Sequence, residues 1–408
     1  MDILTQCRAC QEKDPYLFLP MGNHPPANMF VRPEHLEHEQ PVYPLNTQVC
    51  LNCGLIQIAD QVPENFFQHY LYVPSWASTM HSHFTELAKT LEEQAGGGLI
   101  VDIGCNDGLM LAAANRNGSR TLGIDPAANL AKIARERCVD IHLGYFNRDT
   151  AAIVRDKHGP AKVIVASNTV NHIGDLHGFV ESVMILLEHD GTLVIEVPWA
   201  KDILETNQFD NVYHEHLSEM SLLSIVKLGE FFDLVVVDVH RLRVHGGSMR
   251  IFLRRQEKGQ AQNPTVAKML SEELDAGLLK QSTYVDFAAR VDGVKGDLLQ
   301  MLADLKANNL KVAGYGAAAK GNTLLNYFDI GRDTLDFLVD RNPLKQGLFS
   351  PGKKIPIFGP EAIEKENPDV LLVLAWNFFD EIREQQSAFE RSGGRFLVPL
   401  PTPRMVGA

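Results

Sequence analysis

Two groups of residues in the chain could carry chemistry, and the first is a set of cysteines near its start. Cys7 and Cys10 form one C-x2-C pair, and Cys50 and Cys53 form a second. Two thiolate pairs brought together by a long loop supply the four soft ligands of a tetrahedral zinc ion. The alternative is that they are unpaired, small apolar residues. Four cysteines leave no open coordination position, so the pattern predicts a structural zinc.

The second group lies in the segment FDNVYHEHLSEMSL at 209–222, which places Tyr213, His214, Glu215 and His216 in a row. Histidine is the natural general base near neutral pH, and an adjacent carboxylate can raise its basicity. Consecutive helical residues point about 100° apart, so all four can face one pocket only in an irregular segment. A solvated loop would also tolerate these residues. The segment follows a predicted strand end beside a ligand crevice, which favours a functional role.

The stretch VDIGCNDGLML at 101–111 indicates a strand, a glycine turn and a helix start. Glycines let the backbone approach a ligand, and the helix start offers free N–H groups. Such a turn suits a dinucleotide as well as a methyl donor, but Asp125 ends the next strand about 20 residues later, placed to accept ribose hydroxyls. Asp102 either faces the cofactor or caps the turn. The expected cofactor-binding residues are Asp102, Gly104, Asn106, Gly108, Asp125 and Asn168.

Two further strand ends carry polar side chains. ASNTVNHIGDL at 166–176 puts His172 on the rim of the expected crevice, where a lone histidine is either structural or functional. VAGYGAAAKGNTLL at 312–325 repeats the strand, glycine turn and helix start, and we assign Lys320 and Asn322 to substrate binding. An anion such as a diphosphate would suit that helix N-terminus. The alternative is a second unit of this kind with a purely structural turn.

The elements that must position these residues follow an α/β rhythm. Seven apolar runs predict a first sheet, with strands at 99–104, 121–125, 139–144, 162–168, 192–198, 233–239 and 248–255. The last two are joined by HRLRVHGG, too short for a helical crossover, which predicts an antiparallel hairpin at the edge of a parallel sheet. Helical patterns follow from 262 to 308. A second doubly wound domain is expected from runs at 311–317, 334–340, 354–358, 369–376 and 395–400.

Composition excludes several classes of protein. The 408 residues are 45% hydrophobic and 22% charged, which suits two to three globular domains. The net charge of -13 and the lack of a basic stripe argue against nucleic acid and anionic membranes as partners. No apolar run approaches the roughly 20 residues that span a bilayer, and the start MDILTQCRACQEKDP lacks the features of a signal peptide. We therefore expect a cytoplasmic protein.

Taken in order, these motifs resemble the bacterial sugar C-methyltransferases that act on nucleotide-linked 4-keto sugars in deoxysugar and antibiotic pathways. The resemblance covers nearly the whole chain and rests on PPANMF, YPL, FFQHYLYVPSWAS, VDIGCNDGLML, SNTVNHI, YHEHLS, HGGSMR, GYGAAAKGN and VDRNPLKQG. It implies an α/β protein with a central class I methyltransferase sheet and S-adenosylmethionine (SAM) as cofactor. The implied parts are a zinc-binding domain (1–75), a SAM-binding domain (76–260), a helical connector (261–308) and a C-terminal Rossmann-like domain (309–408).

The resemblance also implies residue roles. His216 corresponds to the family's base, with Tyr213 and Glu215 beside it, and His172 to a second catalytic histidine. Tyr72, or failing that Tyr70, falls on the sugar side. The chain departs from the family at Glu219 and Met220, where aromatics are frequent, and at Trp199, where a smaller ring is frequent. These departures are expected close to the sugar pocket.

The expected reaction is methylation at carbon 3 of a nucleotide-linked 4-keto-deoxysugar, with a thymidine-diphosphate (dTDP) sugar as the expected partner. A carbonyl at carbon 4 acidifies the carbon 3 proton, and its removal gives an enolate that can attack a methyl group. One alternative is O- or N-methylation of a small molecule or sugar. A zinc-ribbon RNA methyltransferase is disfavoured by the acidic charge. A metal-stabilised scaffold without activity would leave the YHEH segment unexplained.

Overall fold

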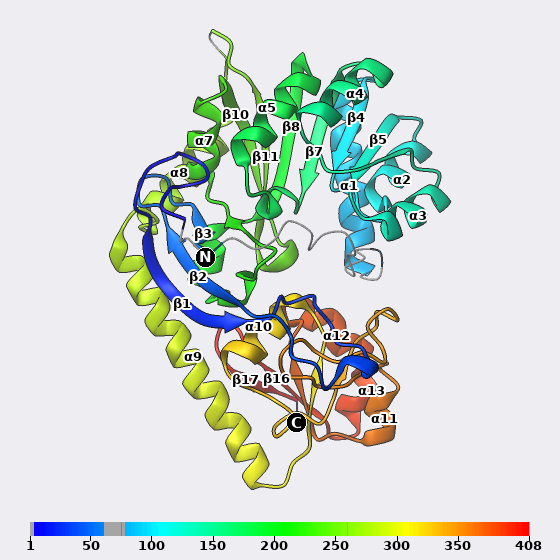
Figure 1. Cartoon of the computed structure of the whole chain (residues 1–408), viewed down its shortest axis with the longest axis vertical. Helices are drawn as coiled ribbons and strands as arrows, with labels where there is room; N and C mark the ends of the chain where they lie inside the picture. The colour runs from blue at the N-terminus through cyan, green and yellow to red at the C-terminus, as the bar shows by residue number, and fades with distance from the viewer. Residues whose placement is uncertain (1–3, 61–74, 76–77, 259, 408) are drawn as a thin grey trace.

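The computed structural model describes residues 4–60, 75, 78–258 and 260–407 (Figure 1). A seven-stranded sheet with its helices forms the upper half of the view, and a six-stranded sheet forms the lower half. The N-terminal strands run along one side and span both halves. In the described part of the chain no helix has the length and apolarity needed to cross a membrane.

The central sheet has the order β10-β11-β8-β7-β4-β5-β6. Its strands are β4 (Leu99–Ile103), β5 (Arg120–Asp125), β6 (Ile141–Leu143), β7 (Ala161–Ser167), β8 (Leu187–Pro198), β10 (Leu234–Leu242) and β11 (Ser248–Arg255). β11 is antiparallel to both β8 and β10, so the predicted edge hairpin and all seven predicted strands are confirmed. All five residues of β4 are buried, as expected for a strand covered by helices on both faces.

Helices cover both faces of this sheet. Ile100 and Val163 point to the face where α1 and α2 pack, while Val101 and Ile164 point to the opposite face with α5 and α7. The helices are α1 (Ser78–Ala95), α2 (Leu109–Arg116), α3 (Ala128–Glu136), α4 (Arg148–His158), α5 (Leu176–Leu186), α6 (Ala200–Glu205), α7 (Leu222–Glu230) and α8 (Pro264–Asp275). Short 3-10 turns are η4 (Val170–His172), η5 (Phe209–Asn211) and η6 (Val244–Gly246).

The N-terminal segment forms a third sheet with the order β1-β2-β3-β9. Its strands are β1 (Tyr16–His24), β2 (Tyr43–Val49), β3 (Ile56–Ile58) and β9 (Ser218–Glu219), and a 3-10 turn η1 (Pro33–His35) lies between β1 and β2. The fourth strand is therefore supplied by the residues that directly follow the YHEH motif. Cys7, Cys50, Cys53 and Leu55 share a hydrophobic core with the central sheet, so this segment has no separate core of its own.

The C-terminal unit is a doubly wound sheet with the order β14-β13-β12-β15-β16-β17. Its strands are β12 (Val312–Tyr315), β13 (Leu338–Val339), β14 (Ile357–Phe358), β15 (Val370–Val373), β16 (Arg395–Val398) and β17 (Arg404–Val406). Its helices are α10 (Ala319–Tyr327), α11 (Ala362–Glu366), η7 (Trp376–Phe378), α12 (Phe379–Gln385) and α13 (Ser387–Arg391). The order reverses between β12 and β15, where such sheets open a ligand crevice. The antiparallel β17 was not predicted.

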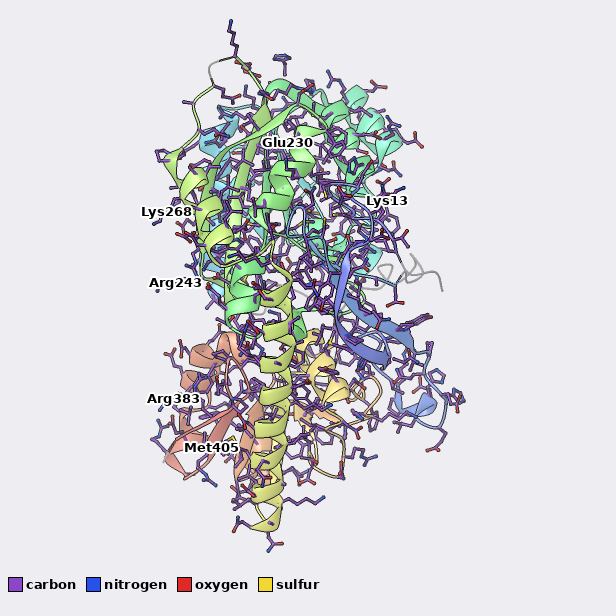
Figure 2. All side chains as sticks on the ribbon, turned by 90° about the vertical axis from the view of Figure 1, so that its left-hand side faces the viewer. Lys13, Glu230, Arg243, Lys268, Arg383 and Met405 are labelled. Carbon is purple, nitrogen blue, oxygen red and sulfur yellow. The ribbon has the colours of Figure 1, made fainter. Side chains whose placement is uncertain are left out.

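A long helix, α9 (Gln281–Ala307), joins the two halves. Figure 2 shows it crossing the lower half along most of its length. Its apolar stripe, which includes Tyr284, Val291 and Leu298, packs in one cluster with β1 and β12. The predicted connector thus contains two helices, of which α8 packs on β10 and α9 on the C-terminal unit. The division at 75, 260 and 308 remains a proposal.

Candidate active site

The turn between β4 and α2 needs glycine. Gly104 has a φ of 74°, and a Cβ there would lie 2.3 Å from Thr169 Oγ1. Asn106 also lies in the left-handed region, with a φ of 52°, and its N–H donates to Asp125 Oδ2 at 2.9 Å. The glycine turn is therefore tied to the end of β5, where Asp125 was predicted to act.

Two carboxylates lie beneath this turn. Asp125 accepts a second hydrogen bond from the Ala127 N–H at 2.8 Å, and burial raises the pKa of its carboxyl. Burial, together with the nearby charges of Asp125 and Glu196, holds the pKa of Asp102 well above its usual range. Both carboxyls face a large cavity. They are placed to accept hydroxyl and amino donors from a bound ligand.

The cavity measures about 940 Å³ and is walled by both halves of the molecule. That volume lies near the upper end of the range of about 300–1,000 Å³ typical of small-molecule sites. Five of the six predicted cofactor residues line it: Asp102, Gly104, Asn106, Asp125 and Asn168. Four predicted catalytic or substrate residues also line it: His172, Tyr213, His216 and Lys320. The structure thus brings most of the predicted site together.

Three predicted residues do not line the cavity. Gly108 is the N-cap of α2 with a φ of 71°, and a Cβ there would meet Ala134 of α3 instead. Asn322 lies about 200° around α10 from Lys320, and its side-chain amide donates to the Ala27 carbonyl at 2.8 Å. Glu215 turns toward the N-terminal segment, as described below. The predicted Tyr70 and Tyr72 lie outside the described residues.

His216 is the centre of a chain of polar contacts. Its Nδ1 lies 3.0 Å from Glu219 Oε1, and its Nε2 lies 2.5 Å from the Tyr213 hydroxyl. Because Nδ1 faces a carboxyl oxygen, we assign the ring proton to Nδ1, which leaves Nε2 to accept the Tyr213 O–H. Burial and the charge of Lys320 lower the pKa of His216 to about 3. The imidazole is therefore neutral at pH 7, and its Nε2 carries no proton.

His172 lies edge-on to His216, with ring centroids 4.8 Å apart and an interplanar angle of 80°. Its Nδ1 donates to the Glu215 carbonyl oxygen at 2.7 Å. Burial and the neighbouring His216 lower the pKa of His172 to about 3, so it too is neutral. The histidine predicted from the fourth strand and the YHEH motif therefore form one wall of the cavity.

The other two residues of the YHEH motif attach it to the N-terminal segment. His214 Nε2 lies 3.2 Å from the carbonyl oxygens of both Tyr43 and Pro44. Glu215 Oε1 accepts from the Asn28 side chain at 3.2 Å, and its Oε2 has no hydrogen-bond partner among the described residues. Burial raises the pKa of Glu215 to about 7. The YHEH segment is neither helix nor strand, and only two of its four polar side chains, Tyr213 and His216, line the cavity.

Lys320 reaches the cavity from the start of α10. Its Nζ donates to the His245 carbonyl at 3.2 Å and lies 5.3 Å above the Trp376 ring. Burial lowers the pKa of Lys320, while Asp210 and Glu219 oppose the shift. The cation is therefore close to the histidine wall as well as to the C-terminal turn.

Several residues of this region were not predicted as site residues. Glu219 was noted only as a departure from the family, although it stands three positions after His216. His245 lines the cavity and has a left-handed φ of 56°. Its place directly before Gly246 and Gly247 could have indicated this role. Arg8 lines the cavity from between the first two cysteines. Nothing in its local sequence indicates that.

The departures at Trp199 and Met220 do not lie at the cavity, contrary to expectation. Both are fully buried in the core of the central sheet. The Trp199 indole donates to Glu273 Oε1 at 2.5 Å, and the same carboxyl accepts the N–H groups of Leu222 and Leu223 at the start of α7. Trp199 therefore anchors α7 and α8 to the end of β8.

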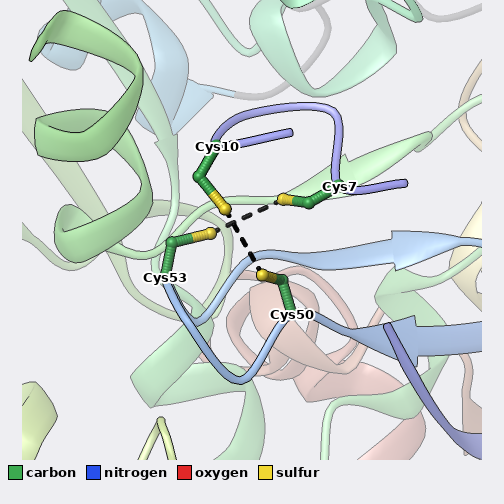
Figure 3. A group of neighbouring side chains, drawn as sticks. All are labelled: Cys7, Cys10, Cys50 and Cys53. Atoms are coloured by element: carbon green, nitrogen blue, oxygen red, sulfur yellow. Dashed lines mark hydrogen bonds between the residues drawn. The ribbon is translucent and has the colours of Figure 1, made fainter. Parts of the chain in front are cut away.

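The four N-terminal cysteines meet as predicted (Figure 3). All four Sγ atoms lie within 4.8 Å of one another, with Cys7 and Cys53 at 3.6 Å and Cys10 and Cys50 at 3.4 Å. Tetrahedral zinc with Zn–S bonds of about 2.3 Å needs sulfur atoms roughly 3.8 Å apart. The thiolates therefore fit a closed zinc site. The Ser221 hydroxyl donates to the Cys53 carbonyl at 2.9 Å, which links this site to the segment after His216.

Comparison with known proteins agrees with the fold and with the four-cysteine zinc-binding segment. Three family models match in sequence: a zinc binding domain over residues 7–67, a methyltransferase domain over 76–239 and a C-methyltransferase C-terminal domain over 243–401. The seven-stranded sheet, its glycine turn and these matches define the class as SAM-dependent methyltransferases with a four-cysteine zinc-binding site. C-methyltransferase NovU from Streptomyces niveus is 36% identical over 409 residues, which is 99% of this chain and 97% of that protein. The chain therefore belongs to the NovU-like family of SAM-dependent C-methyltransferases.

More distant relatives match less than half of the chain. The mitochondrial ubiquinone biosynthesis O-methyltransferase of Bos taurus is 32% identical over 101 residues, covering 24% of this chain and 27% of that protein. The solved structure of the CcbJ methyltransferase from Streptomyces caelestis shares 13% identity with a TM-score of 0.36, covering 43% of this chain and 90% of that one. As a member of the NovU-like family, this protein acts on a small-molecule substrate.

Proposed function

We propose that the protein methylates carbon 3 of a nucleotide-linked 4-keto-deoxysugar, most simply a dTDP sugar, through an enolate. The observation that carries this proposal is the contact between His216 Nε2 and Tyr213, 2.5 Å apart on the wall of the cavity that also contains the glycine turn. A sugar carbon needs a base to become a nucleophile, whereas many O- and N-methylations do not. A buried neutral imidazole beside the methyl-donor turn meets that need.

In this mechanism His216 removes the carbon 3 proton at Nε2. The electron pair of the broken C–H bond forms the enolate, whose carbon then takes the methyl group. Tyr213, released from Nε2 as the sugar binds, donates its hydroxyl to the developing oxygen at carbon 4, with His172 beside it. SAM supplies the electrophilic methyl group. Asp102, Asp125 and the turn at Gly104 and Asn106 would hold it next to the sugar.

The nucleotide is proposed to lie over the carboxyl ends of β12 and β15. Lys320, Arg341 and Lys345 all line the cavity there. Arg341 is paired with the Glu381 carboxylate at 3.3 Å and Lys345 with Asp340 at 3.5 Å. Lys320 donates only to the His245 carbonyl at 3.2 Å and has no ion pair among the described residues, so it is the cation best placed for a diphosphate. The start of α10 adds backbone N–H groups and the positive end of a helix dipole.

The test is incubation of the zinc-loaded protein with SAM and a dTDP-4-keto-6-deoxy sugar in deuterated water, followed by mass spectrometry and NMR. A new carbon-bound methyl at carbon 3 that is lost in His216→Ala supports the proposal. His214→Ala is the matched control, because His214 faces Tyr43 and Pro44 rather than the cavity. A methyl group found on oxygen or nitrogen instead would overturn it.

A further inference from the structure

The carboxyl group of Glu219 lies behind His216, on the side of the ring away from Tyr213. Glu219 Oε1 is 3.0 Å from His216 Nδ1, and the exposed fraction of Glu219 is 1%. Tyr213 and His216 line the cavity, whereas Glu219 does not. Carboxyl, imidazole and phenol are therefore in contact in that order, from a buried carboxyl group to the cavity wall, with the Tyr213 and His216 ring centroids 4.0 Å apart.

The backbone of Glu219 is fixed from the N-terminal segment. Glu219 pairs with Ile56 and Ser218 with Gln57, which joins β9 to β3 in antiparallel register. The Ser221 side chain caps α7 immediately afterwards by accepting the Ser224 N–H at 2.9 Å. The backbone of Glu219 is therefore held on both sides, and its side chain contacts the His216 ring.

The charged groups around this pair come from several elements. Lys320 approaches from α10, His172 from η4, His245 from η6 and Asp210 from η5. Burial holds the pKa of Glu219 well above its usual range, although the charge of Lys320 opposes the shift. Glu219 Oε2 has no hydrogen-bond partner among the described residues, so Oε1 and His216 form its defining contact.

We propose that Glu219 is a positioning residue for His216, fixing its proton on Nδ1 and balancing the positive charge that forms when Nε2 takes the carbon 3 proton. The inference rests on His216 acting as the base. When the carbon–hydrogen bond breaks, its electrons remain on the sugar as the enolate and the proton bonds to Nε2. The ring becomes an imidazolium, whose Nδ1–H donates to the Glu219 carboxylate. The positive charge of the ring favours the ionised form of Glu219, so the two groups are paired by charge while the enolate exists.

The proposal is tested with Glu219→Gln, which keeps an oxygen acceptor but removes the charge. Nitrogen-15 NMR of the histidine rings in the zinc-loaded, substrate-free protein gives the His216 tautomer and pKa, with the signal assigned by its loss in His216→Asn. We expect the His216 ring to lose part of its Nδ1–H population in the variant, and its pKa, already lowered to about 3, to fall further because the opposite charge no longer stabilises the imidazolium. We expect the kcat of deuterium exchange at carbon 3 to fall about 10- to 100-fold while KM changes less than about twofold.

Two variants separate positioning from folding. Glu219→Asp keeps the charge on a shorter side chain and should recover part of the exchange rate and of the His216 pKa. Glu273→Gln removes a carboxyl that is equally buried but contacts Trp199 and the start of α7 rather than His216, and should change neither. An unchanged His216 pKa and exchange rate in a folded Glu219→Gln variant would overturn the proposal, as would an equal loss in Glu219→Asp and Glu219→Gln.

Failure of the proposed reaction would look different. If the wild-type protein catalyses no exchange at carbon 3 but its His216 tautomer and pKa depend on Glu219, the positioning role stands and the role of His216 as carbon base is wrong. If exchange depends on His216 but not on Glu219, the proposed reaction stands and the positioning role is wrong.

Discussion

Arg8 donates from Nη1 to the carbonyl oxygen of Leu217 at 3.0 Å, so a residue between two zinc-binding cysteines holds the residue directly after His216. The same nitrogen donates to the Ile58 carbonyl at 2.9 Å. Burial lowers the pKa of Arg8 to about 10, which still leaves the guanidinium charged at neutral pH. The metal-binding loop therefore contacts the segment that forms the cavity wall at His172 and His216.

Replacing Arg8 should disturb this wall without emptying the zinc site. Arg8→Ala leaves the carbonyls of Ile58 and Leu217 without the side-chain donor, at a cost of about 1–3 kcal/mol in stability. We expect methyl transfer to fall at least about tenfold while zinc content, measured by mass spectrometry, stays at one ion per chain. Arg116→Ala, on the distant end of α2, serves as control. A variant with normal transfer would show that the Leu217 contact is dispensable.

Removing zinc should loosen the β3–β9 pairing. Without a metal to hold Cys50 and Cys53, the strand that pairs with Ser218 and Glu219 loses its anchor. Hydrogen exchange followed by mass spectrometry should show faster exchange in peptides covering 213–221 after chelation, and restored protection when zinc returns. Peptides from β12 and β15 serve as the internal reference. Equal protection with and without zinc would contradict the coupling.

The carboxyl of Glu215 should make stability fall as pH rises. Its pKa of about 7 in the folded protein exceeds the value near 4.5 of an exposed glutamate, so the folded state binds more protons between these two values. Stability then decreases from about pH 4.5 to 7 and stays lower above. Glu215→Gln abolishes this loss, and its advantage over wild type at pH 8 should reach up to about 3 kcal/mol.

Urea unfolding at pH 5 and pH 8 measures the effect. The difference between Glu215→Gln and wild type should be small at pH 5 and positive at pH 8. Glu364→Gln, on α11 of the C-terminal unit, should show no such change. A constant difference at both values would mean that Glu215 does not titrate in this range.

The glycine turn should depend on Gly104. Gly104→Ala introduces a Cβ 2.3 Å from Thr169 Oγ1 at a φ of 74°, and the turn must move to accommodate it. Calorimetric titration with SAM should show binding weakened at least about tenfold, since a displacement of the loop separates Asn106 from Asp125. Gly118→Ala also adds a Cβ at positive φ but meets nothing within 4 Å, and should bind normally.

The regular parts of the fold were predictable because they are buried on both faces. Strands such as β4 and β7 appear in the sequence as nearly continuous apolar runs, whereas β6 at the edge is short and only partly buried. β9 could not be found in this way. Its two residues, Ser218 and Glu219, form a strand only because β3 lies beside them, and no local pattern encodes that pairing.

Those residues of the candidate site whose place in the sequence determines that they line the cavity were predictable. Asp125 follows from its place at the end of the second strand, and His216 and Tyr213 from the dense YHEH motif. The orientations of Glu215 and Asn322 were not, because both turn toward the N-terminal loop at Asn28 and Ala27. Contacts between segments so far apart in the chain have no counterpart in local sequence.

The shared strand β9 also bears on how the chain acquires its structure. During synthesis, the cysteine loops and β1 to β3 leave the ribosome long before Ser218 and Glu219 exist to complete their sheet. Their apolar residues stay uncovered until the central sheet has formed, because Cys7, Cys53 and Leu55 belong to the core of that sheet. We therefore expect the zinc-binding segment and the central sheet to fold as one cooperative unit, with the cavity wall that contains His172 and His216 forming only when both are complete.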